Sequence, residues 1–247
     1  MIDWAGMLAG LAALAIGGVL KGATGIGAPV LAVPLLSALY GVPTAVALFA
    51  LPNLVLNGLQ AREYRAHLAP AGLILPLGLA GLVGTWLGVR VLVSVPSEAL
   101  LLTMALTVFA YLGFRLARPN WALPMPVARK IAAPTGLAAG VMFGAVGISA
   151  PVSVTFLSAI RLGRASFVAT ISAFFFVLGL AQIPMLLTTG VMTPILALLS
   201  LLAILPIWLG MPLGARLARR FSAEAFDRLT LLLIGLIGVR MLYQALT

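Results

Sequence analysis

The sequence contains no cysteine and few charged residues. Without cysteine, the chain has no disulfides, no thiolate nucleophile and no cysteine-ligated metal site. Only 8% of its residues are charged, compared with about a quarter in a typical soluble domain. A soluble fold cannot bury the apolar surface that remains, so we expect a lipid bilayer to surround most of the chain.

Acidic residues are scarce as well, and none lies inside an apolar run. They stand at segment ends: Asp3, Glu63, Glu98, Glu224 and Asp227. Proton-coupled carriers usually keep a carboxylate within the membrane, so we predict transport without a carboxylate relay. Sodium coupling through backbone carbonyls, or the membrane potential alone, stays open. The single histidine, His67, offers no metal-ligand set, and we predict no cofactor, no metal and no catalytic residue.

Apolar residues are abundant and make up 63% of the chain, with a mean hydropathy of +1.20. The apolar runs are continuous rather than alternating, and several reach the roughly 20 residues that a transmembrane helix needs. We therefore predict an all-α polytopic membrane protein. We interpret the formal net charge of +10 as a sign of membrane topology, because cationic residues collect on one side of a membrane protein. No nucleic-acid partner is expected.

One motif of thirteen residues occurs twice, 122 residues apart. GVLKGATGIGAPV (Gly18–Val30) and GVMFGAVGISAPV (Gly140–Val152) are identical at nine positions. Internal repeats are common in secondary transporters. We predict a first repeat in residues 1–116, a cytoplasmic linker in residues 117–130 and a second repeat in residues 131–247.

Each predicted repeat starts with a broken, re-entrant helical hairpin, at about residues 4–40 and 131–160, and continues with three transmembrane helices. This organisation is predicted because the apolar pieces at residues 29–40, 131–143 and 151–160 are shorter than the roughly 17 residues that span a membrane. If each hairpin were replaced by two short helices that both cross the membrane, the chain would return to the same side before the next three helices. The charge distribution therefore fits both versions, and both stay open.

The distribution of cationic residues indicates that the second repeat is inverted. With a hairpin and three spans in each half, one face of the membrane receives Arg62, Arg65, Arg115, Arg118, Arg129, Lys130, Arg161, Arg164, Arg216, Arg219, Arg220 and Arg228. Only Arg90 and Arg240 fall on the other face. Such an excess marks the cytoplasmic side. We expect both termini in the periplasm of a bacterial inner membrane.

The two copies of the motif are predicted to interrupt the helix inside the membrane. Gly22, Gly25 and Gly27 allow a turn, and a proline suits the first turn of the helix that follows. The new helices are expected to start at Ala28–Pro29 and Ala150–Pro151. A helix amino terminus carries about half a positive charge and attracts anions. In inverted repeats, two such ends can converge near the midplane.

Lys21, at the edge of the first break, is costly inside a bilayer unless an anion compensates it. The predicted substrate-binding residues are Lys21, Thr24, Gly25, Gly27, Ala28, Asn53, Asn57, Gln60, Gly147, Ser149, Ala150 and Gln182. Purely structural roles stay open for these residues. The lysine can snorkel to the interface, the glycines can serve close helix packing, and the amides can form interhelical hydrogen bonds.

With its second copy, GAVGISAPVSVTFLS, the stretch GATGIGAPVLAVPLL resembles the duplicated motifs of the TauE/SafE sulfite-exporter family. The resemblance extends over the whole chain. It implies a membrane transporter of small sulfur-containing anions, such as sulfite, sulfoacetate or another organosulfonate. Ala23, Thr24 and Ala28 stand where many members have additional glycines, so the substrate is expected to differ from that of the namesake proteins.

The combined prediction is a secondary transporter that binds a small anion between the two broken-helix tips and works by alternating access. Its partners are the anion and the lipid bilayer, and a homodimer stays open. The alternatives are an anion channel of the same fold, a membrane-embedded enzyme and a purely structural membrane protein. Neither the identity of the anion nor the direction of transport is predicted.

Overall fold

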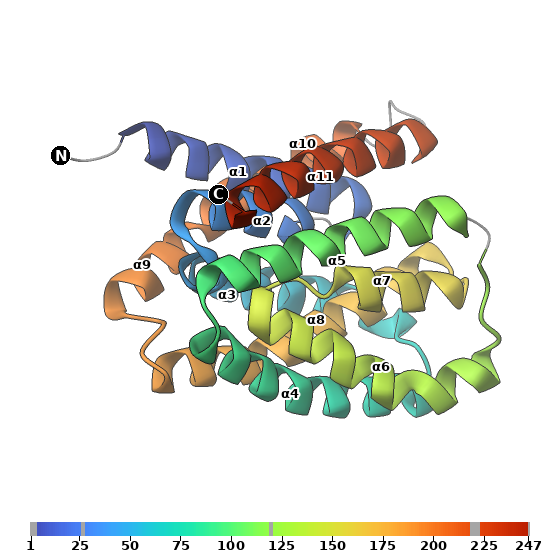
Figure 1. Cartoon of the computed structure of the whole chain (residues 1–247). Helices are drawn as coiled ribbons and strands as arrows, with labels where there is room; N and C mark the ends of the chain where they lie inside the picture. Colours follow the sequence, from blue (N-terminus) through green and yellow to red (C-terminus); the bar gives the residue numbers. More distant parts are fainter. Residues whose placement is uncertain (1–3, 26–27, 119–120, 218–222, 247) are drawn as a thin grey trace.

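In the computed structural model, residues 4–25, 28–118, 121–217 and 223–246 are described, and within these ranges the secondary structure is entirely helical. The helices are α1 (Trp4–Thr24), α2 (Ala28–Tyr40), α3 (Val42–Glu63), α4 (Ala71–Ser94), α5 (Ser97–Ala117), α6 (Met125–Val146), α7 (Ala150–Ala159), α8 (Arg164–Thr188), α9 (Pro194–Leu202), α10 (Ile204–Leu217) and α11 (Ala223–Leu246). A short 3-10 turn, Arg65–His67, follows α3. Figure 1 shows the start of α1 and the end of α11 at one end of the bundle, with the end of α5 and the start of α6 at the other.

Six stretches of the described chain are long and apolar enough to cross a membrane: Gly6–Thr24, Val42–Glu63, Ala71–Ser94, Ser97–Ala117, Arg164–Thr188 and Pro194–Leu217. The last is one continuous apolar run in the sequence, and it is divided at Ala203 into α9 and α10. Pro206 explains the division, because it has no N–H to donate to the carbonyl of Leu202 one turn earlier. The chain is thus an all-α, multi-pass membrane protein.

The first predicted break is confirmed. The helix α1 ends at Thr24, Gly25 has a φ of +84°, and its N–H donates to the carbonyl of Lys21 over 2.7 Å. Glycine adopts this left-handed conformation without the strain that a side chain introduces. From its start at Ala28, α2 returns along α1, and the Tyr40 hydroxyl donates to the carbonyl of Gly6 over 2.6 Å.

The second break repeats this geometry. Gly147 has a φ of +74° and donates its N–H to the carbonyl of Phe143 over 2.9 Å. The short helix α7 then runs back towards the start of α6, where Leu123 donates to the carbonyl of Ala159 over 2.8 Å. The piece at residues 131–143, which was predicted to be too short to span alone, is part of a longer helix, and that helix is not among the described stretches that are long and apolar enough to cross a membrane. The helix α6 starts at Met125 and has 22 residues, because it includes the polar turn around Arg129.

Two helices of the first half pack closely against helices of the second half. Along the contact between α4 and α6, residue numbers increase in the same direction on both helices. Gly136 contacts Leu77, Gly140 contacts Gly81 and Gly144 contacts Thr85. The two helices therefore run in the same direction. A side chain at any of these glycines would overlap the backbone of α4. Gly140 and Gly144 of the duplicated motif therefore serve close helix packing.

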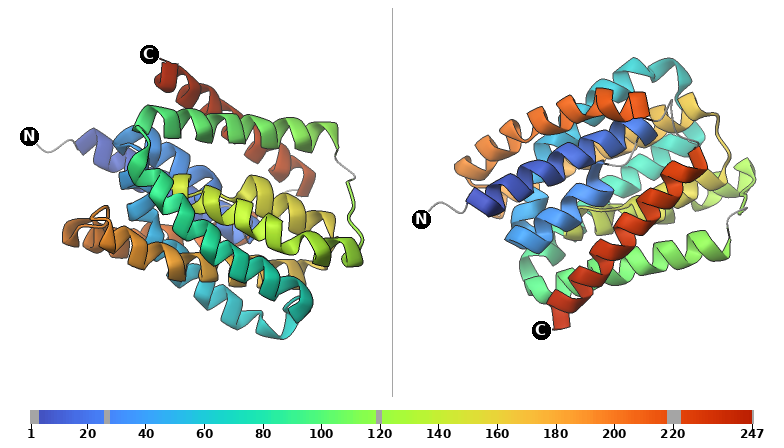
Figure 2. Two further views of the ribbon diagram at one scale, coloured as in Figure 1. Left: turned by 60° about the horizontal axis from the view of Figure 1, so that its bottom comes forward. Right: turned by 90° about the horizontal axis from the view of Figure 1, so that it is seen from above.

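The pair α1 and α10 packs in the same manner (Figure 2). Gly18 lies on Ile207 and Gly22 on Met211, while Gly214 lies on Val19. Gly22 was predicted to belong to the break, and this was wrong. It lies inside α1 and brings the backbones of α1 and α10 together.

At the centre of the molecule, α3 and α8 run in opposite directions. Gly58 lies against Phe176, whereas Gly179 lies against Leu54 and Asn53. Residue numbers along α3 therefore increase in the direction in which those along α8 decrease. The side-chain amide of Asn53 donates to the carbonyl of Phe175, the residue that aligns with Asn53 in the duplicated sequence. The two aligned helices therefore meet near these aligned residues.

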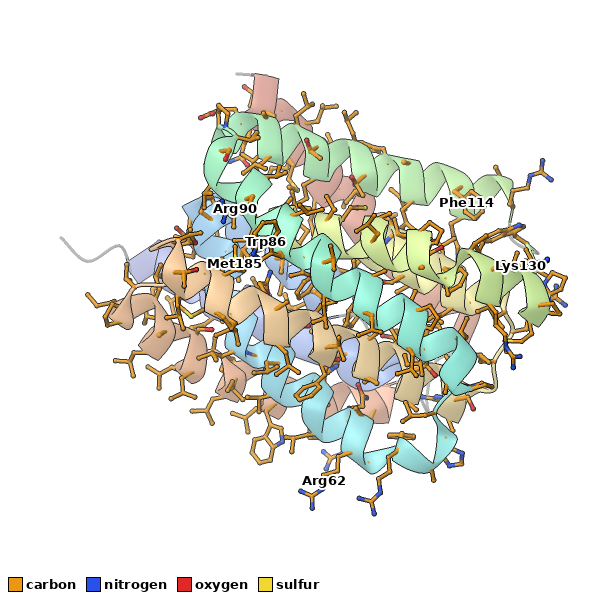
Figure 3. The ribbon with its side chains drawn as sticks, turned by 90° about the horizontal axis from the view of Figure 1, so that it is seen from below. Arg62, Trp86, Arg90, Phe114, Lys130 and Met185 are labelled. Atoms are coloured by element: carbon orange, nitrogen blue, oxygen red, sulfur yellow. The ribbon has the colours of Figure 1, made fainter. Side chains whose placement is uncertain are left out.

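Cationic side chains gather at the end of the bundle where α5 ends and α6 starts. The helix ends at this position are connected by hydrogen bonds from Leu123 to Ala159 and from Arg164 to Ala23. The described cationic residues at these ends are Arg62, Arg65, Arg115, Arg118, Arg129, Lys130, Arg161, Arg164 and Arg216. Arg90 lies near the last turn of α4, and Figure 3 shows it at the end of the bundle away from Lys130.

Candidate functional site

Lys21 is buried inside the protein rather than extended to an interface. Its side chain lies in the last turn of α1 and is 2% exposed. The ammonium group donates to Asn57 Oδ1 over 2.7 Å and to Gln60 Oε1 over 3.0 Å. Both acceptors lie on α3, so the predicted lysine and two of the predicted amides form one cluster.

A chain of hydrogen bonds fixes the orientation of these amides. Asn57 Nδ2 donates to the carbonyl and to Oδ1 of Asn53, each over 2.8 Å, and Asn53 Nδ2 donates to the carbonyl of Phe175 over 3.0 Å. These bonds orient Asn57 so that its Oδ1 accepts from Lys21, while Asn53 Oδ1 accepts from Asn57.

Ser172 on α8 completes this group, because its hydroxyl donates to Gln60 Oε1 over 2.8 Å. We refer to Lys21, Asn53, Asn57, Gln60 and Ser172 as the Lys21 cluster. Ser172 was not predicted. The signal that was available is a polar residue inside the apolar run of α8, but serine alone is too common in membrane helices to be assigned a role.

No carboxylate neutralises Lys21 in the described part of the chain. The acidic side chains described there are Glu63 and Glu98, which lie at the end of α3 and the start of α5, and neither forms an ion pair with Lys21. An ammonium group has three donors, and two of them are used by the neutral amide oxygens. One donor of the ammonium group has no partner among the described residues.

The first break lies close to this cluster. Gly17 and Lys21 are one turn apart and share a face of α1, and Gly17 contacts Ala28 at the start of α2. The ammonium group therefore belongs to the same region as the amino terminus of α2. On the outer side of the break, Gly25 packs against Val168, and Arg164 Nη2 donates to the carbonyl of Ala23 over 3.5 Å.

The other residues predicted at the first break have local contacts. Thr24 donates its hydroxyl to the carbonyl of Leu20 over 2.8 Å. Ala28 is buried, and Gly27 lies outside the described residues. Gly25 uses its N–H to close the end of α1, so that N–H is occupied within the protein.

The second break is polar only at two serines. Ser149 and Ser153 are buried, with their hydroxyl oxygens 3.3 Å apart, and Ser153 also donates to the carbonyl of Ser149 over 2.9 Å. Ala150 is buried beside them. Gln182 donates to the carbonyl of Phe143 over 3.1 Å, which is an interhelical hydrogen bond away from the Lys21 cluster.

The two halves differ at the positions that align with Lys21 and Asn53. Phe143 aligns with Lys21, and it is buried with its ring stacked on Phe175 at a centroid distance of 6.2 Å. Phe175 in turn aligns with Asn53. A buried aromatic pair therefore occupies in the second half the place that a lysine and an amide occupy in the first.

The two glycine turns do not meet in this structure. Gly25 contacts Val168, and Gly147 contacts Val33 and Val46. Val46 lies seven residues before Asn53 on α3, and Val168 lies seven residues before Phe175 on α8. Seven residues of helix are about 10 Å long. Because α3 and α8 are antiparallel, the two turns lie about 10 Å to opposite sides of the Asn53–Phe175 contact along the helix axes. Each turn packs against the other half, and the expected single site between two facing tips is not formed in this conformation.

Comparison with known proteins identifies one family. The family described as Sulfite exporter TauE/SafE matches residues 9–241. No curated protein and no solved structure shows a significant match.

Proposed function

Since the chain belongs to the TauE/SafE family of membrane transporters, we propose that it carries a small sulfur-containing oxyanion and that Lys21 binds this substrate. Sulfite, sulfoacetate and related organosulfonates are the proposed substrates. The observation that carries the proposal is the buried Lys21 ammonium group, which among the described residues has neutral acceptors only and one unused donor.

The energetics favour an anion at this position. A lysine at the centre of a membrane helix costs about 2.5–3.5 kcal/mol on insertion scales. The amide oxygens of Asn57 and Gln60 solvate the ammonium group, but they leave its charge in place. An oxyanion about 4 Å away gains about 4 kcal/mol at an effective dielectric constant of about 20. This gain is large enough for the lysine to act as a binding group.

The remaining donors suit an oxyanion with several acceptor oxygens. Gln60 Nε2 has no acceptor among the described residues, while its Oε1 is held by Lys21 and Ser172. The amino terminus of α2 contributes a partial positive charge from the other side of the break. Lys21, Gln60 and the start of α2 are therefore proposed to surround the substrate, whereas Asn53, Asn57 and Ser172 hold Lys21 and Gln60 in place.

The packing of the helices supports inverted repeats and a moving interface. Inverted halves require aligned helices to run in opposite directions, as α3 and α8 do. We propose that α1 moves with α10 and that α6 moves with α4, because their backbones are in close contact. Movement of these pairs relative to α3 and α8 would separate Lys21 from Asn57 and Gln60, and thereby alternate access to the substrate.

The orientation in the membrane follows from the charges. The arginine-rich end of the bundle is proposed to face the cytoplasm of a bacterial cell, with both termini in the periplasm. A negatively charged substrate then gains about 2.3 kcal/mol per 100 mV on leaving the cell, so the membrane potential favours export without a proton-carrying carboxylate.

Counterflow in proteoliposomes tests this proposal. Vesicles loaded with sulfite or sulfoacetate are expected to accumulate the same labelled anion, and Lys21→Met is expected to reduce the initial rate at least about tenfold, which corresponds to about 1.4 kcal/mol. Lys130→Met, at the exposed start of α6, is the matched control and should transport normally. A non-saturable flux without counterflow would favour a channel. Normal transport by a folded Lys21→Met variant would remove Lys21 from the site.

A further inference from the structure

A second basic site lies at the arginine-rich end of the bundle, away from the Lys21 cluster. A cavity of about 350 Å³ opens between the last turns of α5 and α7. Its lining includes Arg115, Arg118, Arg161, Thr155, Ser158 and Trp121. Three guanidinium groups and two hydroxyl groups thus share one cavity, and no carboxylate contributes to its described lining.

Three arginines line this cavity beside the carboxyl-terminal ends of two helices. Arginine near a helix carboxyl terminus often balances the partial negative charge of the terminal carbonyl groups, which is about half an elementary charge for each helix. The ends of α5 and α7 together supply about one negative charge. Three arginines therefore outnumber the helix ends at this cavity, and Arg115 and Arg161 each form a further interaction within the protein.

The backbone around the cavity is held in a defined conformation. Arg161 has a φ of +56°, a conformation that is unfavourable for residues with a side chain. Its N–H donates to the carbonyl of Ser158 over 3.0 Å. On the opposite wall, Trp121 packs edge-to-face on Phe114, with a centroid distance of 5.3 Å, and donates its backbone N–H to the carbonyl of Arg118 over 3.2 Å.

We propose that this cavity binds a phosphate group, carried either by an anionic phospholipid headgroup or by a small soluble phosphate. Arginine pairs with phosphate through two parallel hydrogen bonds, and hydroxyl groups such as those of Ser158 and Thr155 can donate to the remaining oxygens. The volume lies within the range of small-molecule sites. The half-exposed Trp121 ring lies beyond the last turn of a membrane-spanning helix, where tryptophan typically contacts lipid headgroups.

Tryptophan fluorescence provides a local probe for this test. Replacing Trp4, Trp86 and Trp208 by phenylalanine leaves Trp121 as the single tryptophan. Phosphatidylglycerol brominated near the headgroup is expected to quench Trp121 at least about twofold more than brominated phosphatidylcholine. In a parallel arm without anionic lipid, inorganic phosphate or glycerol 3-phosphate is titrated against chloride at equal ionic strength.

Arg161→Gly combined with Arg115→Gln is the diagnostic variant. Glycine accepts the positive φ at position 161, so loss of the fold is not expected, and the melting temperature in detergent checks this. Arg65→Gln is the matched control, since Arg65 lies at the same end of the bundle outside the cavity.

Each outcome decides the proposal. A preference for phosphatidylglycerol that the double variant loses and the control keeps identifies a lipid phosphate. A response to soluble phosphate alone, again lost in the double variant, identifies a free phosphate. Equal quenching by both lipids together with no response to phosphate would overturn the proposal, as would a preference that survives in the folded double variant.

Discussion

Gln60→Glu distinguishes a lysine that binds a transported anion from a lysine that serves only packing. Gln60 Oε1 accepts from Lys21 over 3.0 Å and from Ser172 over 2.8 Å, and a glutamate oxygen can keep both bonds. The second oxygen replaces an amide nitrogen that has no acceptor among the described residues. Asn57 is less suitable, because its amide nitrogen donates to Asn53.

The substitution supplies Lys21 with a permanent counter-ion. The substrate then loses an attraction of about 4 kcal/mol at an effective dielectric constant of about 20, and tenfold in affinity corresponds to about 1.4 kcal/mol. We expect the KM for sulfite or sulfoacetate in counterflow to rise at least about 100-fold. The melting temperature should change little, because the attraction within a buried ion pair is largely offset by its desolvation.

Gln60→Met is the control for the charge. It removes the acceptor but leaves Lys21 positive, so we expect a loss of about 1–3 kcal/mol of stability and a KM that rises much less than in Gln60→Glu. If the glutamate variant folds and transports with an unchanged KM, the reasoning that connects the Lys21 charge with the substrate is refuted.

Three further substitutions test the helix packing, the second turn and the limits of the site. In a detergent unfolding assay, Gly22→Ala should cost about 1–3 kcal/mol in stability, because a Cβ there overlaps the Met211 carbonyl. Gly113→Ala is the control in the same assay. A Cβ at Gly113 has no neighbour within 4 Å, so this variant should be neutral or stabilising. Gly147→Ala should cost about 1–2 kcal/mol because of its positive φ, and an unchanged unfolding midpoint would argue against the turn. Gln182→Met should leave the KM unchanged and cost about 0.6 kcal/mol for the lost bond to Phe143, whereas a large rise in KM would place Gln182 in the site.

Much of the fold could be predicted because its signals are local. Continuous apolar runs predicted the spans, and the glycine and proline positions predicted the ends of α1 and α6 and the starts of α2 and α7. The division at Ala203 and the early start of α6 at Met125 were missed. Both depend on how single prolines and a polar turn are accommodated, and a hydropathy pattern does not report this.

The candidate site could be predicted only in part. The spacing of Asn53, Asn57 and Gln60 indicated one face of a helix, and the cost of a buried charge pointed to Lys21. The pattern did not reveal that Asn57 and Gln60 accept from the lysine while Asn53 holds Asn57 in place. It also did not reveal Ser172, because the contact between α3 and α8 joins residues 112 positions apart.

The prediction that both breaks contribute to one site relied on the symmetry of the motif. Symmetry of sequence determined neither the distance between the turns nor the chemistry of the second one. Phe143 and Phe175 make that second position aromatic, and Gly25 and Gly147 pack on opposite sides of the α3–α8 crossing. Such long-range placement depends on packing between the two halves.

The most direct measurement is the position of a bound substrate analogue. A structure determined with 2-bromoethanesulfonate would locate bromine by its anomalous scattering and the sulfonate oxygens by their density. We predict a sulfonate oxygen within hydrogen-bond distance of the Lys21 ammonium group, with Gln60 and the start of α2 beside it. A sulfonate bound at saturating concentration elsewhere in the membrane region, with Lys21 still bonded only to Asn57 and Gln60, would contradict the account.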